Sequence, residues 1–145
     1  MNQSICHKIQ KSAFYYKRLM NQILAPYHLT FAQYQVLKTI QHHEGITAKD
    51  ILIYIDSDKA TLSGVLTRLE KNGLVLRHPD SNDRRLMHIY LTEKSRLFCK
   101  NIYEIEIMCE SEMTGKIRSK DLKIFDSVYA QIIANLESKT VEKPQ

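Results

Sequence analysis

The sequence predicts a mainly α fold: a winged helix-turn-helix with a two-stranded wing, flanked by helices at both ends of the chain. Three observations predict it. Apolar residues recur every three or four positions over most of the chain, which is the period of an amphipathic helix. A short helical segment, a tight turn and a second helical segment follow one another between residues 47 and 73. The next segment, residues 74–91, changes to short runs of strand-forming residues around the turn sequence "PDSND".

The N-terminal segment predicts one long amphipathic helix. Apolar side chains recur from Ile5 to about Leu24 in steps of three or four residues, so they share one face. Pro26 then ends the helix. Thr30 and Gln33 follow as a capping box, which predicts a second helix. The apolar face of that helix carries Phe31, Tyr34, Leu37 and Ile40.

The helix-turn-helix comes next. Thr47 and Asp50 repeat the capping arrangement before a short helix, "AKDILIYI". Turn residues Asp56 and Ser57 separate it from the segment "DKATLSGVLTRLEKNG", which an Asn-Gly pair closes. One stripe of this second helix is expected to be buried, and its members are Leu62, Val65, Leu66 and Leu69.

The second half of the chain predicts a hairpin and two long helices. The runs "LVLRH" and "LMHIYL" flank the turn sequence as two strands. Thr92 caps a long helix through roughly Met113, interrupted after that by "TGKIRS". The inward positions of this helix are expected to be Leu97, Ile102, Ile105 and Met108 or Cys109. A final helix from about Lys120 carries apolar residues near a coiled-coil spacing, at Leu122, Phe125, Tyr129, Ile132 and Leu136.

Length, charge and cysteine usage narrow the class of protein. The 145 residues suit one domain, and the net charge of +5 fits an anionic partner such as nucleic acid. No apolar run approaches the roughly 18 residues of a membrane span, so no membrane partner is expected. The start lacks the apolar core of a signal peptide, which predicts a cytosolic location. Three widely spaced cysteines give neither a disulfide framework nor a metal knuckle.

Nothing in the sequence predicts an enzyme, a cofactor or a metal site. An enzyme needs a nucleophile with a base, or paired carboxylates in one cleft, and no stretch offers either arrangement. The six histidines are adjacent in a loop or scattered along the chain, and no pair has the helical i, i+4 spacing of metal ligands.

The outer face of the second helix of the helix-turn-helix is small, hydroxylic and basic. It carries Lys59, Thr61, Ser63, Gly64, Thr67 and Arg68. Small residues let a helix enter the major groove deeply, and hydroxyl and basic groups meet phosphates and base edges. A polar outer face is equally the default of any amphipathic helix. The hairpin decides between these interpretations, because Arg84 and Arg85 stand at its tip beside Asp83 and can reach a narrow minor groove. The sequence therefore predicts binding to double-stranded DNA; the alternative is a winged-helix module that binds only proteins.

The segment "DKATLSGVLTRLEKNGLVLRHPDSNDRRLMHIYLTEK" resembles the multiple-antibiotic-resistance regulator (MarR) family. The order and spacing of "LEKNGLV", a basic residue at Arg77, "NDRR" and "LT" carry the resemblance, which extends over nearly the whole chain. It implies a homodimeric, cytoplasmic bacterial transcription regulator, usually a repressor, that binds a pseudo-palindromic operator. It also implies that Asp83 orients the wing and that Arg85 enters the minor groove, and we expect Arg84 to meet a phosphate.

The resemblance implies a single MarR-like domain over residues 1–145. Its DNA-binding lobe covers residues 30–92, and dimerisation helices cover 1–26 and 93–138. A physical argument supports the dimer: the terminal helices carry full apolar stripes that a winged helix does not need for its own core, so something must cover them. A long intramolecular bundle is the alternative.

The resemblance also implies an effector cleft between the dimerisation helices and the DNA-binding lobe. Candidate lining residues are Tyr16, Met20, Phe31, Tyr34 and Met108, although aromatic and methionine stripes are also ordinary core. The expected effector is a small phenolic or lipophilic ligand, or an oxidant. Cys6 is the redox candidate, because peroxide-sensing members of the family keep a reactive cysteine near the start of the first helix. His7 and Lys8 adjoin Cys6, and bases near a helix N-terminus favour a thiolate. A small buried or incidental cysteine is the other interpretation.

Overall fold

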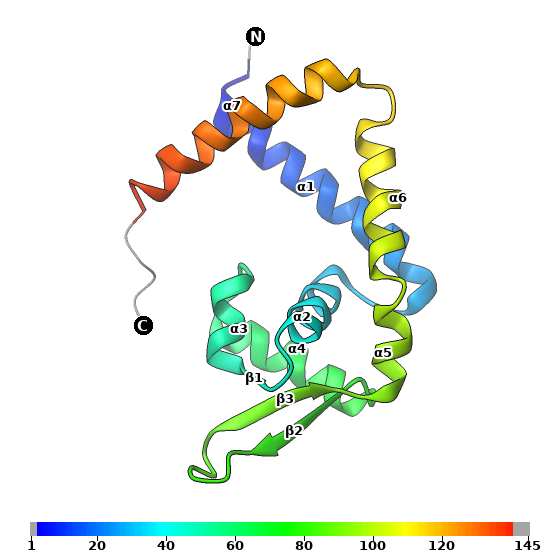
Figure 1. The fold of residues 1–145 in the computed structure, drawn as a ribbon, viewed down its shortest axis with the longest axis vertical. Helices are drawn as coiled ribbons and strands as arrows, with labels where there is room; N and C mark the ends of the chain where they lie inside the picture. The colour runs from blue at the N-terminus through cyan, green and yellow to red at the C-terminus, as the bar shows by residue number, and fades with distance from the viewer. Residues whose placement is uncertain (1–2, 141–145) are drawn as a thin grey trace. The chain divides into compact units, whose positions relative to one another are not determined.

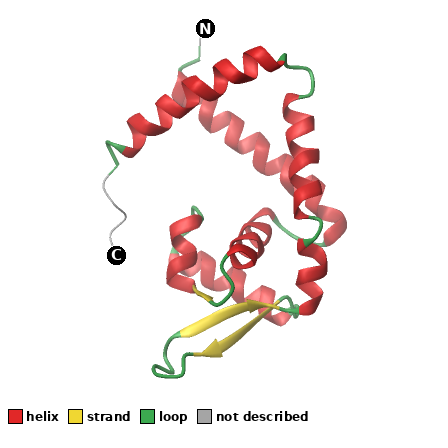
Figure 2. Cartoon of the chain, in the orientation of Figure 1, coloured by secondary structure: helices red, strands yellow, loops and turns green. Residues whose placement is uncertain are grey.

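The computed structural model describes residues 3–140. The chain divides into two compact units, Met1–Cys109 and Glu110–Gln145. Its elements are α1 (Ile5–Leu24), the 3₁₀ turn η1 (Ala25–Tyr27), α2 (Phe31–His42), β1 (Ile46–Thr47), α3 (Ala48–Tyr54), α4 (Lys59–Lys71), β2 (Val75–Pro79), β3 (Met87–Leu91), α5 (Glu93–Cys99), α6 (Ile102–Thr114) and α7 (Ser119–Glu137). Figure 1 labels the α-helices and the strands. The fold is mainly helical with one small sheet, as the sequence predicts (Figure 2).

Side-chain caps start the helices where the sequence places them. The hydroxyl of Thr30 accepts from the backbone N–H of Gln33, whose side chain accepts from the Thr30 N–H in return, so the predicted capping box is confirmed. The Thr47 and Thr92 hydroxyls accept from the N–H three residues on, at the starts of α3 and α5. Each such cap satisfies a donor that the helix itself leaves free, which typically contributes about 1 kcal/mol.

Helix α2 is central to the core of the first unit. It contacts α1, α3, α4, α5 and β3. The predicted apolar stripe of α4 is buried against it and the sheet, because Leu62, Val65, Leu66 and Leu69 are all at most 8% exposed. Burial of such side chains contributes roughly 1.5–3 kcal/mol each, so this stripe fixes the orientation of α4 and hence which of its faces meets solvent.

The sheet has one strand more than the predicted hairpin. Strands β2 and β3 pair antiparallel, with Arg77 opposite Ile89 and His78 opposite His88. The two-residue strand β1 adds to the other edge of β3, with Ile46 opposite Ile89. Two residues are too short a run to show strand periodicity, so the sequence pattern could not reveal β1.

The prediction of one long helix after Thr92 is wrong in one respect. The chain instead forms two helices, α5 and α6, which are separated by residues 100–101. The carbonyl of Cys99 accepts from the Gln41 side chain at 3.4 Å, which takes an acceptor that a continuous helix would use. The buried positions keep one helical spacing across the break, at Ser95, Cys99, Ile102, Ile105 and Cys109, and Leu97 lies off this stripe. Ile102, Ile105 and Cys109 point inward as expected, whereas Leu97 and Met108 are 60% and 53% exposed.

Helices α1 and α7 keep most of their apolar side chains exposed. In α1 only Met20 and Leu24 are buried. In α7 no residue is buried, and Phe125 and Ile124 are 58% and 62% exposed. Over residues 3–140, the chain forms no helix that is both long and apolar enough to cross a membrane.

Candidate nucleic-acid interface

The exposed face of α4 carries all six side chains that the sequence singled out on this helix. Lys59, Thr61, Ser63, Gly64, Thr67 and Arg68 are all exposed. Asp58 caps the helix, since its carboxylate accepts from the Thr61 N–H at 2.7 Å. This backbone hydrogen bond to Thr61 is the main reason that the pKa of Asp58 is lowered. The cap therefore remains ionised at neutral pH and holds the start of α4 in place.

Gly64 lies in the middle of this face and has open space beside it. A Cβ built at this glycine meets no heavy atom within 4 Å. Glycine in a helix interior costs about 1 kcal/mol relative to alanine. Packing within the chain therefore does not require a glycine at this position.

The turn of the β2–β3 hairpin holds the two arginines of the wing. The Asp80 N–H donates to the Leu86 carbonyl at 2.8 Å, and the Leu86 N–H donates to the Asp83 carbonyl at 2.9 Å, so the turn is closed by its own backbone. One Asp83 carboxylate oxygen accepts from both the N–H and the Nε of Arg85, at 3.0 and 3.2 Å. The Arg85 side chain is otherwise 93% exposed. Asp83 therefore orients the Arg85 side chain, which remains exposed to solvent.

A histidine links this turn to the rest of the sheet. On β3, the His88 ring places Nδ1 2.7 Å from the Gly45 carbonyl and Nε2 2.9 Å from the second carboxylate oxygen of Asp80. The hydrogen bond to Asp80, followed by that to Gly45, raises the pKa of His88. The His88 bond, together with bonds from the N–H groups of Asn82 and Asp83, lowers the pKa of Asp80 to about 2. Sequence reasoning missed this pair, because the two residues are eight positions apart and meet only through the hairpin register.

Two contacts join the C-terminal end of α4 to the base of the wing. The Arg77 Nε on β2 lies 3.3 Å from a carboxylate oxygen of Glu70 on α4. The Thr92 hydroxyl donates to the Gly73 carbonyl at 2.7 Å, which fastens the end of β3 to the end of α4. These contacts hold the base of the wing to the C-terminal end of α4.

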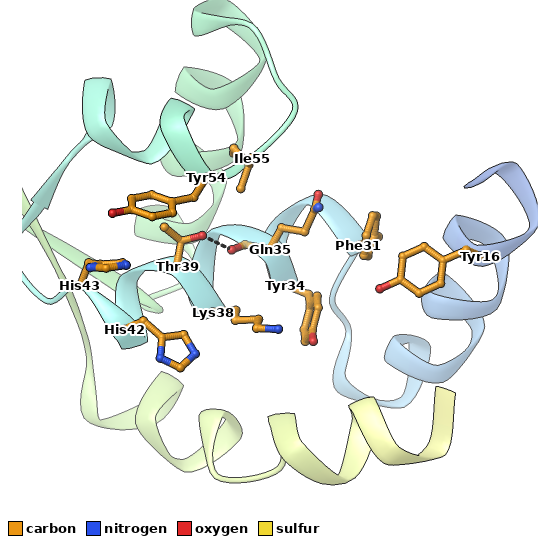
Figure 3. Close-up of a pocket in the computed structure, with 10 residues that line it drawn as sticks. All are labelled: Tyr16, Phe31, Tyr34, Gln35, Lys38, Thr39, His42, His43, Tyr54 and Ile55. Atoms are coloured by element: carbon orange, nitrogen blue, oxygen red, sulfur yellow. Dashed lines mark hydrogen bonds between the residues drawn. The ribbon is translucent and has the colours of Figure 1, made fainter. Parts of the chain in front are cut away.

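A pocket of about 310 Å³ lies beside α2 (Figure 3). Its lining residues are Tyr16, Phe31, Tyr34, Gln35, Lys38, Thr39, His42, His43, Tyr54 and Ile55. Aromatic rings in the pocket contact one another in pairs. The Tyr16 and Phe31 rings meet edge-on with their centroids 5.4 Å apart, and the His43 and Tyr54 rings stack with their centroids 4.5 Å apart. Aromatic walls with a few polar groups are typical of small-molecule sites.

Glu106 of α6 ties two lining residues together. Its carboxylate accepts from the Tyr34 hydroxyl at 2.9 Å and is also paired with the Lys38 ammonium. Burial works to raise the pKa of Glu106, but the hydrogen bonds from Lys38 and Tyr34 outweigh burial and lower it. Burial and the bond to Glu106 raise the pKa of Tyr34, so this phenol stays protonated. The Lys38 ammonium group in the pocket is therefore already paired with the Glu106 carboxylate.

The structure brings together three of the five residues predicted to line a cleft. Tyr16, Phe31 and Tyr34 line the pocket. Met20 is instead buried in the core at 1% exposure, and Met108 is exposed on α6. Sequence reasoning missed the polar half of the pocket, namely Lys38, Thr39, His42 and His43, because α2 was assessed only by its apolar face.

The three cysteines differ in exposure. Cys6 is exposed in the first turn of α1, where the Ser4 hydroxyl accepts from the His7 N–H. Cys99 and Cys109 are buried. Burial raises the pKa of the Cys99 thiol to about 11, so this thiol is a poor nucleophile at neutral pH.

Two helices joined by a turn and followed by a basic hairpin define a winged helix-turn-helix protein. The model of the MarR family matches residues 29–87, which run from just before α2 to the first residue of β3. The transcriptional regulator HosA of Escherichia coli O157:H7 is 30% identical over 97 residues, covering 67% of this chain and 72% of that protein. The chain belongs to the MarR family of transcription regulators, which confirms the resemblance seen in the sequence.

Two further proteins are similar to the chain. The HTH-type transcriptional regulator TtmR of Methylorubrum extorquens (strain PA1) is 34% identical over 96 residues. That match covers 66% of this chain and only about half, 49%, of the relative. A crystal structure of a mutant MarR from E. coli complexed with operator DNA has a TM-score of 0.80 at 24% identity, covering 88% of this chain and 92% of that one. The similarity to this MarR crystal structure confirms the winged-helix fold.

Proposed function

We propose that this protein is a sequence-specific DNA-binding transcription regulator that represses its target genes as a homodimer. Its work is regulatory rather than catalytic, and it takes place in the bacterial cytoplasm. The observation that carries the proposal is the pairing of a small, basic and exposed α4 face with the exposed arginine turn of the wing. A module that bound only proteins would have no reason to present this charge on one surface element.

The two parts of this surface have different tasks. Exposed Lys59, Thr61, Ser63, Gly64, Thr67 and Arg68 on α4 enter the major groove and meet base edges and phosphates. Arg85, aimed by the Asp83 carboxylate, enters the minor groove, where negative potential is concentrated in narrow segments. Arg84, exposed beside it, neutralises a phosphate. In this scheme residues 30–92 form the DNA-binding lobe of a single domain over residues 1–145.

The dimer uses the helices outside that lobe, in residues 1–26 and 93–138. Both α1 and α7 leave apolar faces exposed in a single chain, and such faces normally meet a partner surface. A second copy of the chain supplies this surface, and a two-fold axis then presents two α4 helices to successive major grooves. The operator is accordingly pseudo-palindromic, with half-sites about one helical turn apart.

The effector is a small aromatic molecule, phenolic or otherwise lipophilic, that binds in the pocket beside α2. The rings of Tyr16, Phe31 and Tyr34 stack on it. An acidic group on the ligand competes with Glu106 for the Lys38 ammonium. Benzoate is therefore a suitable first probe: Lys38→Gln should weaken its binding, and Glu106→Gln should strengthen it by releasing the ammonium. Equal binding by both variants and the parent would place the ligand elsewhere.

An oxidant is the second candidate effector, and the exposure of Cys6 at the start of α1 favours it. In that case Cys6 is oxidised while the buried thiols of Cys99 and Cys109 are not.

The experiment that tests the proposal is selection of bound duplexes from a random-sequence DNA pool. A regulator of this kind should enrich one pseudo-palindrome, and the alignment of the enriched sequences gives both the operator and its half-site spacing. A pool that shows no enrichment after several rounds would contradict sequence-specific binding and favour a protein-interaction module.

A further inference from the structure

The ring of His88 has acceptors at both of its nitrogens. Nδ1 lies 2.7 Å from the Gly45 carbonyl oxygen, and Nε2 lies 2.9 Å from the Asp80 carboxylate. A carbonyl and a carboxylate can only accept hydrogen bonds, so each nitrogen must carry a proton for both bonds to form. The arrangement is complete only for the imidazolium form. A neutral ring, whichever tautomer it adopts, turns one lone pair toward an acceptor and loses one of the two bonds.

A continuous chain of bonds runs from this ring to Arg85 in the wing. The Asp80 carboxylate that accepts from His88 also accepts from the backbone N–H groups of Asn82 and Asp83, at 2.8 and 3.0 Å. The Asp83 carboxylate in turn holds the backbone and side chain of Arg85. At its other end the ring is anchored to Gly45, just before β1. His88 therefore connects the turn of the wing to the body of the sheet.

We infer that His88 in its imidazolium form is a positioning residue for DNA recognition, so that DNA affinity declines as this ring loses its proton. The inference rests on the proposed DNA binding of the wing. When the ring is neutral, Asp80 or Gly45 loses its bond, the turn at residues 80–85 is held less firmly, and Arg85 must be ordered at the moment of binding.

The neighbouring groups favour the charged ring. The charged and titratable groups on the elements next to His88 are Asp80 in the turn, Arg77 and His78 on β2, Tyr90 on β3, Glu44 before β1, and Lys49, Asp50 and Tyr54 on α3. Arg77 is paired with Glu70, and the Tyr54 ring stacks on His43. Asp80 bonds the ring directly, whereas Glu44 pairs with Arg96 at 2.6 Å and Asp50 accepts from Thr47. His78 is the cross-strand partner of His88, and its ring lies 5.6 Å from that of Tyr90, centroid to centroid.

The direction of the pH effect follows from the two pKa shifts. The pKa of Asp80 is lowered to about 2, so this carboxylate stays ionised through the neutral range and His88 is the group that titrates. The pKa of His88 is raised, mainly by the bond to Asp80. Wing ordering is therefore fully present below the ordinary histidine pKa and is lost as pH rises through the raised one.

The test compares DNA affinity with the state of the ring. Affinity for the duplex recovered by selection is measured between about pH 5.5 and 8.5 at constant ionic strength, for the parent, His88→Gln and the control His78→Gln. The control removes the other histidine of the hairpin and leaves both bonds of the His88 ring in place. We expect His88→Gln to weaken binding at low pH by about two- to tenfold, the worth of one net hydrogen bond, and to flatten the pH profile. His78→Gln should keep the profile of the parent. Asp80→Asn should move its midpoint to lower pH, which a purely structural role would not do.

A measurement without DNA separates this inference from the proposed function. Heteronuclear NMR of the imidazole nitrogens should show both of them protonated in His88 at pH 6, with the amide signals of residues 80–85 shifting together as the ring titrates. The inference is overturned by a ring with one protonated nitrogen at pH 6, by turn signals that ignore its titration, or by equal pH profiles for the parent and His88→Gln. If no duplex binds at any pH while the ring and the turn titrate together, the proposed DNA binding is wrong. The link between protonation of His88 and the order of residues 80–85 is then still supported.

Discussion

Replacement of Gly64 by alanine should make the protein more stable and a weaker DNA binder. The glycine lies within α4, its backbone is helical, and an added Cβ meets nothing within 4 Å. The substitution therefore gains the helix propensity of alanine without a clash, about 0.5–1 kcal/mol. For a chain of this size that gain corresponds to a rise in Tm of about 2–4 °C at fixed protein concentration. Scanning calorimetry and fluorescence anisotropy with a labelled duplex measure the two effects.

The same methyl group stands where we place the DNA. An intruding methyl in a close contact costs about 1–3 kcal/mol, so affinity for the selected duplex should fall roughly five- to a hundredfold. Gly115→Ala is the contrasting control, because a Cβ there lies 2.6 Å from the Ser111 carbonyl and should destabilise the fold. A stabilised Gly64→Ala variant with unchanged DNA affinity would refute the close approach of α4 to the groove.

Three further predictions follow from the same surfaces. Arg85→Ala should weaken operator binding by about 1–3 kcal/mol in anisotropy titrations and leave the thermal transition unchanged, since the side chain is 93% exposed. Arg118→Ala, which opens a similar exposed Arg–Asp pair outside the winged helix, should have no such effect on binding. The intact chain should sediment at about 34 kDa, twice its mass of 17.0 kDa. Deletion of the residues after Ser119 should yield monomers or aggregate. An intact monomer that still bound a palindrome tightly would count against the dimer. If Cys6 is a redox sensor, a hydroperoxide should release the protein from DNA and Cys6→Ser should not respond, whereas equal release of both proteins would end that hypothesis.

Local signals in the sequence were sufficient for most of the helices and for the hairpin. The Thr30–Gln33 capping box and the Asn-Gly end of α4 act within a few residues, so spacing alone places these boundaries. The apolar stripe of α4 determines its exposed face for the same reason. The six side chains expected on that face are therefore exposed, although their contact with DNA stays a prediction.

Features that depend on contacts between distant residues could not be read from spacing. The break between α5 and α6 involves the Cys99 carbonyl and a side chain 58 residues away, on Gln41. The pocket is completed by Tyr16 of α1 and Tyr54 of α3 on either side of α2, and Glu106 of α6 contacts Tyr34 and Lys38 in it. The His88–Asp80 pair needs the hairpin register. In each case the residue types were visible and their neighbours were not.

The most direct test of DNA binding is the dependence of affinity on salt. Binding of the protein to a random-sequence duplex is titrated at several salt concentrations, with Arg84→Ala alongside. If α4 and the wing neutralise phosphates, the logarithm of the association constant should fall linearly with the logarithm of salt concentration through counterion release. Arg84→Ala should reduce the slope by about one. Binding that is absent, or that does not change with salt, would contradict the central claim.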